Sequence, residues 1–173
     1  MLLDLLGVTL AGSNTREIHD LVQAWEPWEG PAVVIGHGRN TDVDTSALIN
    51  AASACCLELD EGNKYAGGHP AAHVIFAALG TAQSSAQPIS GHQLLAAITV
   101  GYEIAARFGA ATTLKKGWHP HGHWGATGAA SSVALLKNLD RKDIAAAIDT
   151  TAGLMQTTPW PLVTEGAFPY LPD

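Results

Sequence analysis

Two short histidine-containing loops hold most of the side chains in this sequence that could move protons. The first histidine loop is LDEGNKYAGGHP, residues 59–70, which contains Asp60 and His69. The second histidine loop is GWHPHGHWG, residues 117–125, which contains His119. Imidazole titrates near neutral pH, and glycine-rich loops carry chemistry more often than packing. We therefore predict an acid/base site built from these two loops.

His69 is the strongest single candidate in the first histidine loop. It follows Gly68, which permits close backbone approach to a ligand, and it precedes Pro70, where a helix is predicted to begin. The free N–H groups at such a helix start favour an anion. A carboxylate beside the imidazole would fix its tautomer and raise its pKa. Three acids are candidates for that carboxylate, and the alternative is that they are solvated on a surface loop: Glu58, Asp60 and Glu61.

The second histidine loop spaces His119, His121 and His123 two residues apart. In an extended segment the three side chains would share one side, a geometry that could hold zinc. The glutamate that follows the first histidine of the metalloprotease signature is absent, so we expect no metal. We favour His119 as a single catalytic imidazole because it follows Lys115 and Lys116, which would attract carboxylates unless they are merely solvated. A metal-dependent hydrolase using the three histidines stays open as an alternative.

Composition limits the class of protein. The chain has 173 residues, enough for one domain, with 47% apolar and only 14% charged residues. Sparse charge suggests a surface covered by another subunit or by a part of the polypeptide absent here. The net charge of −7 argues against nucleic-acid binding. We see no apolar run of about 18 residues and no basic leader, so we expect no membrane association and a cytoplasmic location.

Hydrophobic periodicity predicts an all-α fold, an antiparallel helical bundle without a parallel sheet. Only residues 32–36 are typical of a strand or an extended connector. Adjacent Cys55 and Cys56 are predicted to be buried reduced thiols. We expect a helical domain over residues 1–155 and a proline-rich tail over 156–173 that leads toward a missing second domain. Helices are expected from residue 2 to 11, from a Ser13 or Asn14 cap through Trp25, from an Asp42 or Asp44 cap to Leu59, from Pro70 through Leu79, from a Ser90 cap to Ala111, from 122 to 136 and after an Asp140 cap.

Several motifs in a fixed order resemble the MmgE/PrpD family, which includes 2-methylcitrate dehydratase and cis-aconitate decarboxylase. The resemblance extends from the first helix to about Gly166. It is carried by DLLGVTLAGS at 4–13, the first histidine loop, GYEIAAR at 101–107, and GWH at 117–119 leading into GATGAA at 125–130.

The resemblance implies a lyase without a cofactor that acts on a small polycarboxylate, with a helical domain followed by an α/β domain and the active site between them, commonly as a homodimer. It matches His69 and His119 to family histidines, which we expect to handle protons while Asp60 orients one imidazole. Which histidine is the acid stays open. Residues expected to bind substrate are Glu58, Glu61, Asn63, Gly68, Lys115 and Lys116.

Departures from the family pattern set a second hypothesis beside the lyase. Family chains run to several hundred residues, so we expect truncation, with only the helical part of the protein and half of its pocket in this chain. A catalytic lysine of some members has no match within residues 155–160. The alternative is a non-enzymatic helical module, or degenerate copy, that dimerises through apolar faces.

Overall fold

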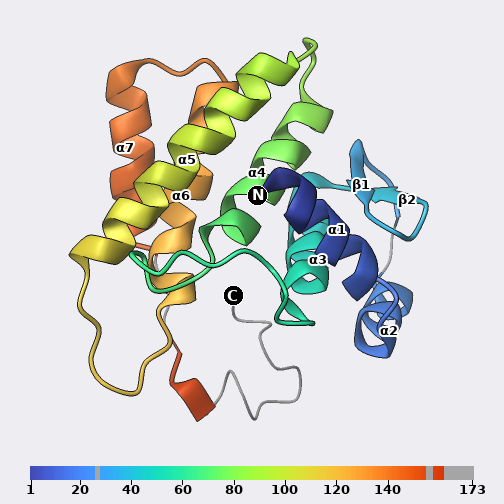
Figure 1. Cartoon of the computed structure of the whole chain (residues 1–173). Coiled ribbons are helices and arrows are strands. Elements are labelled where there is room, and N and C mark those ends of the chain that lie inside the picture. Colours follow the sequence, from blue (N-terminus) through green and yellow to red (C-terminus); the bar gives the residue numbers. More distant parts are fainter. Residues whose placement is uncertain (26–27, 155–157, 162–173) are drawn as a thin grey trace.

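Helices dominate the structure, which is a computed structural model. It describes residues 1–25, 28–154 and 158–161; for residues 121–123 it describes only the backbone. The described residues form seven helices and one two-stranded antiparallel sheet (Figure 1). The predicted all-α class is therefore confirmed. The elements are α1 (Leu2–Gly12), α2 (Arg16–Ala24), β1 (Ala32–Val34), β2 (Arg39–Thr41), α3 (Val43–Cys55), α4 (Pro70–Ser84), α5 (Gly91–Ala111), α6 (His121–Leu136) and α7 (Arg141–Ala152).

Side-chain caps fix where most helices begin. Thr15, whose hydroxyl accepts a hydrogen bond from the Ile18 amide, caps α2. The predicted cap at Ser13 or Asn14 is wrong, because the Ser13 amide still donates to the Thr9 carbonyl at the end of α1. The other predicted caps are confirmed, with Asp42 rather than Asp44 on α3; they are Asp42, Ser90 and Asp140.

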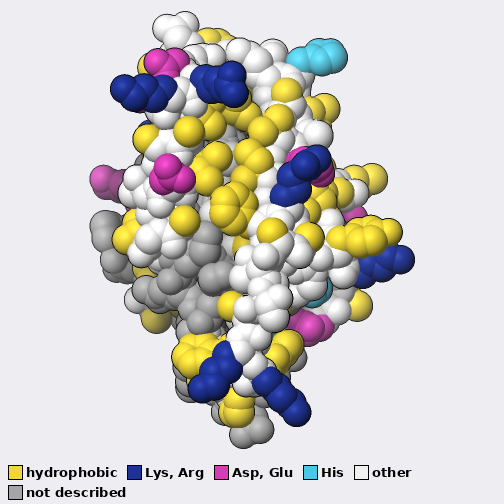
Figure 2. Space-filling view, turned by 90° about the vertical axis from the view of Figure 1, so that its left-hand side faces the viewer, with side chains coloured by type: hydrophobic (Ala, Val, Ile, Leu, Met, Phe, Trp, Pro, Cys, Tyr) yellow, Lys and Arg dark blue, Asp and Glu magenta, His cyan; other side chains and the backbone are white. Residues whose placement is uncertain are grey.

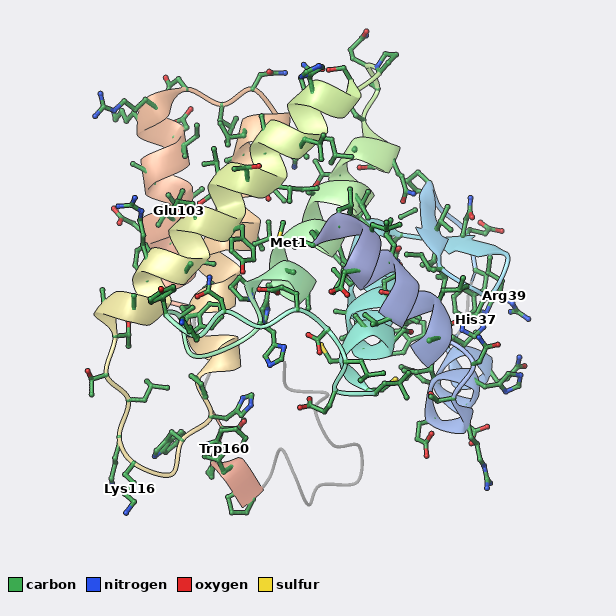
Figure 3. All side chains as sticks on the ribbon, viewed as in Figure 1. Met1, His37, Arg39, Glu103, Lys116 and Trp160 are labelled. Carbon is green, nitrogen blue, oxygen red and sulfur yellow. The ribbon has the colours of Figure 1, made fainter. Side chains whose placement is uncertain are left out.

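The predicted strand forms one arm of a small hairpin. β1 pairs with β2 through a turn in which Gly36 and Gly38 take positive φ values of 84° and 60°. The sequence Arg-Asn-Thr gave no apolar signal for β2. Asn50 of α3 holds the hairpin, because its side chain accepts from the Ile35 amide and donates to the Val33 carbonyl. Figure 3 labels Arg39 on this hairpin, far from Lys116 and Trp160.

The main core lies where α5 and α6 cross beside α4. A β-carbon added to Gly101 would lie 2.6 Å from the Gly128 carbonyl oxygen, and one added to Gly128 would lie 2.4 Å from the Gly101 oxygen. Glycine at both positions therefore lets the two backbones touch. Trp124, 1% exposed, belongs to the second histidine loop and begins the buried face of α6. This crossing fixes how α6 carries that loop.

One side of the bundle keeps a broad apolar surface, which we name the α5–α7 face. Among described residues α7 has no fully buried side chain, and Figure 2 shows apolar side chains gathered along this side. By length and composition alone α5 could cross a membrane, a test that the core helix of a soluble protein also passes, and 22% of that apolar window is buried. The large apolar side chains exposed on or beside these two helices are Leu95, Val100 and Phe108 of α5 with Leu139 and Leu154 beside α7.

The glycine contact between α5 and α6 predicts a large cost for one added methyl group. Gly101→Ala should lower the free energy of unfolding by about 1–3 kcal/mol, because backbone atoms cannot move aside. Gly7→Ala is the matched control, since an added β-carbon there meets nothing within 4 Å. It should be neutral or stabilise by up to about 1 kcal/mol. Urea denaturation measures both, and equal stabilities of the two variants would contradict the packing.

Candidate functional site

Both histidine loops lie at the same end of the bundle, the lower end in Figure 1. The first histidine loop joins α3 to α4, and the second joins α5 to α6. Ala66 of the first loop packs against the end of α5, where a β-carbon on Gly109 would lie 2.7 Å from the Ala66 carbonyl oxygen. The first loop therefore reaches the point from which the chain continues toward the second.

A buried ion pair joins Asp60 to His69 at the base of the first histidine loop. Asp60 Oδ2 lies 3.0 Å from His69 Nδ1, and the Asp60 side chain is only 2% exposed. The hydrogen bond to the Asp60 carboxylate raises the pKa of His69 to about 9, and burial acts in the opposite direction. The negative charges of Asp60, Glu58 and Glu61 act in the same direction. His69 is therefore cationic at neutral pH.

Cys55 contacts the same carboxylate from the end of α3. Its Sγ lies 3.8 Å from Asp60 Oδ2, within the range of a weak thiol hydrogen bond. Both cysteines are free thiols, and Cys55 is buried as predicted. Cys56 is half-buried, and burial raises the pKa of its thiol. Asp60 is thus set between a thiol and an imidazole.

Glu61 and Asn63 fasten the loop to the helices. Glu61 Oε2 accepts a hydrogen bond from the Ala71 amide at 3.0 Å, so this helix-start donor is already paired with a protein carboxylate. The Tyr102 hydroxyl of α5 donates to Glu61 Oε1, and Asn63 Nδ2 donates to the same hydroxyl oxygen at 3.2 Å. Burial and the Glu61 contact raise the pKa of Tyr102 to about 12. These contacts give Glu61 and Asn63 a structural task that the sequence analysis did not foresee.

The other first-loop candidates divide between a hollow and the outer surface. Asn63, Gly68 and His69 help line an open hollow of about 450 Å³. The Gly68 carbonyl also accepts from the Asn63 amide at 2.8 Å, which closes the loop on itself. Glu58 is exposed just after α3, with a positive φ of 51°. Its negative charge helps to raise the pKa of the His69 imidazole.

His119 lies inside the second histidine loop and is 2% exposed. Its amide donates to the Thr158 carbonyl at 2.8 Å, and the Trp160 amide donates to the Gly117 carbonyl at 3.0 Å. The Trp160 ring meets the imidazole edge to face, with ring centroids 4.4 Å apart. No signal in the proline-rich surroundings of Trp160 in the sequence points to this contact. The His121 and His123 side chains, and residues 162–173 of the predicted tail, lie outside the described residues.

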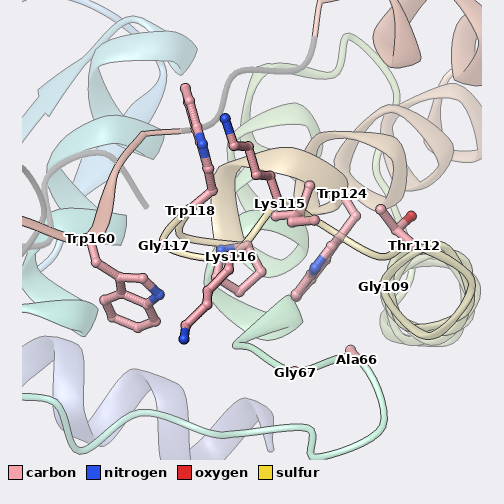
Figure 4. Close-up of a pocket in the computed structure, with 12 residues that line it drawn as sticks. Ala66, Gly67, Gly109, Thr112, Lys115, Lys116, Gly117, Trp118, Trp124 and Trp160 are labelled. Atoms are coloured by element: carbon pink, nitrogen blue, oxygen red, sulfur yellow. The ribbon is translucent and has the colours of Figure 1, made fainter.

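A pocket of about 350 Å³ opens between the two loops (Figure 4). Gly67 lines both this pocket and the hollow beside His69, so the two spaces adjoin. In Figure 4 the Lys116 side chain extends into the space between Trp160 and Trp124. Among the residues with described side chains, no group of three histidines, cysteines or carboxylates could hold a metal ion. Among the described residues that line the pocket, the positively charged side chains that could attract an anion are Lys115 and Lys116.

The Asp60–His69 pair predicts a measurable titration. In the wild-type chain the His69 imidazole should titrate near pH 9, and in Asp60→Asn its pKa should fall toward or below 6.5, because burial then acts without the main compensating hydrogen bond. NMR of the ring signals measures both. Glu103→Gln removes an exposed carboxylate that pairs with Arg107 and should leave the titration unchanged. A midpoint near 6.5 in the wild type would contradict the pairing.

The same pair should also make stability depend on pH. The folded-state pKa of His69 lies above its ordinary value of 6.5, so the contribution to the free energy of unfolding is complete below pH 6.5 and is lost as the pH rises toward 9. Urea denaturation between pH 6 and 10 should show this decline in the wild type and a smaller one in Asp60→Asn. Parallel pH profiles of the two proteins would contradict it.

Known relatives agree in pointing to one family. Residues 1–161 match the model of the MmgE/PrpD N-terminal domain. The chain is 28% identical over 160 residues to the cis-aconitate decarboxylase-like protein oryM of Aspergillus oryzae, covering 86% of this chain and 33% of that protein. It is 30% identical over 148 residues to the cis-aconitate decarboxylase of Aspergillus terreus, covering 80% and 30%. The chain thus spans about a third of the length of the curated relatives it matches, and it belongs to the MmgE/PrpD family as a helical N-terminal domain.

Proposed function

We propose that this chain is the helical part of a lyase that needs no cofactor and acts on a small polycarboxylate. The observation that carries the proposal is the buried Asp60–His69 pair beside a hollow that adjoins a lysine-lined pocket. The names of the relatives make cis-aconitate the first substrate to test. Their length means that the complete activity would draw on further residues beyond those of this domain.

His69 suits the role of acid in such a reaction. When a carbon–carboxylate bond breaks, carbon dioxide leaves and the electron pair stays on carbon, which must then take up a proton. When water is expelled instead, the leaving hydroxyl must be protonated. A group with a pKa of about 9 holds its proton at neutral pH and can serve either step. Asp60 engages Nδ1, so the transfer would use Nε2.

His119 and the two lysines complete the proposed arrangement. With His69 protonated, His119 is the better candidate for the base, because a lyase that removes a proton needs a second titrating group near the substrate. Lys115 and Lys116 line the pocket and would attract substrate carboxylates despite the net charge of −7. The pocket volume of about 350 Å³ lies within the usual range for a small-molecule site.

Loss of the imidazole at His69 should remove the activity. His69→Gln should lower the rate of cis-aconitate consumption at least a hundredfold, the usual contribution of a general acid. Carbon dioxide release and NMR of the products measure the rate. His92→Gln changes an exposed histidine on α5 and should keep the wild-type rate. A wild-type rate in His69→Gln would contradict the assignment.

The second candidate, a helical dimerisation module, is favoured by the α5–α7 face. Its large exposed side chains and a chain with only 14% charged residues indicate a surface that a partner covers. A second copy of the same chain is the partner that we propose, because closed two-fold dimers are the commonest assemblies of soluble proteins. A lyase domain could form the same dimer, so this candidate replaces the first only if wild-type protein neither binds nor converts any polycarboxylate.

Mass in solution tests the α5–α7 face. The wild-type chain should have twice its 18.0 kDa mass by light scattering, and Val100→Asp should return it to the single-chain mass, because a charge there would lose solvation on association. Leu3→Asp is the control, since Leu3 is 86% exposed on α1. A monomeric wild type, or a dimer that Val100→Asp leaves intact, would contradict this interface.

A further inference from the structure

We propose that Trp160 is a positioning residue that holds the His119 imidazole in place behind the residues that line the pocket. The inference rests on the proposed function for its consequence, since a fixed imidazole matters most where it handles protons. Its geometric part stands independently, on contacts between described residues. Trp160 lies 41 positions after His119, beyond α6 and α7. The chain must therefore return to the second histidine loop for Trp160 to contact His119.

Backbone hydrogen bonds fix this return. The His119 amide donates to the Thr158 carbonyl at 2.8 Å, and the Trp160 amide donates to the Gly117 carbonyl at 3.0 Å. Together they form an antiparallel bridge between Trp118 and Pro159. These two hydrogen bonds, one on each side of the bridge, define the register between the two segments. A shift by one residue would turn the Trp160 side chain to the opposite side of the segment.

The ring contact restrains the imidazole directly. The two ring planes meet at 84° with centroids 4.4 Å apart, a favourable edge-to-face arrangement. His119 is 2% exposed whereas Trp160 is 43% exposed, so the indole covers the imidazole and keeps part of its own surface open. Trp160 also lines the pocket, and His119 lies between two residues that line it, Trp118 and Pro120. The Trp160 indole therefore forms part of the pocket wall and also supports the His119 ring.

The physical consequence is a lower freedom of rotation for the imidazole. A buried histidine that must exchange a proton works best when its ring is held near the productive orientation. Trp160 would supply that restraint from outside the second histidine loop, as Asp60 supplies it to His69 through an ion pair. The two imidazoles are then oriented by different forces, one by a carboxylate and the other by an aromatic ring.

Four variants of the chain test this role: Trp160→Ala, Trp160→Phe, Trp160→Leu and Trp118→Ala. NMR of the histidine rings reports the surroundings of His119, and titration with cis-aconitate reports binding. In Trp160→Ala the His119 ring signals should shift more than those of any other described histidine. Affinity for cis-aconitate should fall about three- to tenfold, as expected for loss of an aromatic pair.

Comparison of an aromatic with an aliphatic replacement of Trp160 distinguishes positioning of the His119 ring from simple filling of space. Trp160→Phe should keep the affinity within about twofold of the wild type, whereas Trp160→Leu should behave like Trp160→Ala. Trp118→Ala is the matched control for the pocket wall, because Trp118 lines the same pocket, and it should shift the His119 ring signals less than Trp160→Ala does. Circular dichroism checks that each variant is folded, and Trp160→Phe tests the role even if Trp160→Ala unfolds.

The outcomes distinguish this inference from the proposed function. Unchanged His119 signals in Trp160→Ala, or rescue by leucine as complete as by phenylalanine, would overturn the positioning role. If wild-type protein binds no cis-aconitate while the ring signals respond as expected, the contact between the two rings stands and the proposed substrate fails. If the wild type binds and Trp160→Ala binds equally well with altered ring signals, the contact is structural and the positioning role is overturned.

Discussion

The requirement that a buried carboxylate be paired governs the arrangement of this domain's candidate site. Asp60 is almost completely removed from solvent, and an unpaired charge there would cost several kcal/mol. The His69 imidazolium compensates that charge at one end of α4. Because the pair joins residues nine positions apart, it closes the first histidine loop and directs it toward α5. The position of the loop and the protonation of its histidine therefore have one cause.

The second constraint is close contact between helices. Glycines at the crossing of α5 and α6 bring the two backbones together, so the loop that connects them begins and ends within a narrow space. Tyr102 on α5 then reaches Glu61 and Asn63 of the first histidine loop. Packing of small residues in the bundle core thus determines which polar side chains can meet at its end.

Sequence reasoning succeeded where the determinants are local. The capping residues of α3, α5 and α7 act within one turn of the chain, and Pro70 begins α4 as a first-turn proline should. The clustering of acids near His69 likewise contained the partner, Asp60. The same reasoning misassigned the start of α2. The helical hydrogen bonding of α1 continues to Ser13, whose amide donates to the Thr9 carbonyl, so Ser13 ends α1 and does not cap α2.

Sequence reasoning could not reach contacts made across the bundle. The tasks of Glu61 and Asn63 depend on Tyr102, about forty positions away, and the support of His119 depends on Trp160 at a similar separation. No spacing rule joins such residues, since the lengths of α5, α6 and α7 decide what meets. The second strand of the hairpin was missed for a related reason. Its pairing comes from Val33 and its neighbours, whereas its own composition is polar.

We propose that both histidine loops serve one ligand. Titration of the wild-type protein with cis-aconitate, followed at the ring signals of His69 and His119 in the same NMR samples, tests it most directly. We expect both imidazoles to respond with a single dissociation constant. A response at only one of them, or two different dissociation constants, would contradict a shared site.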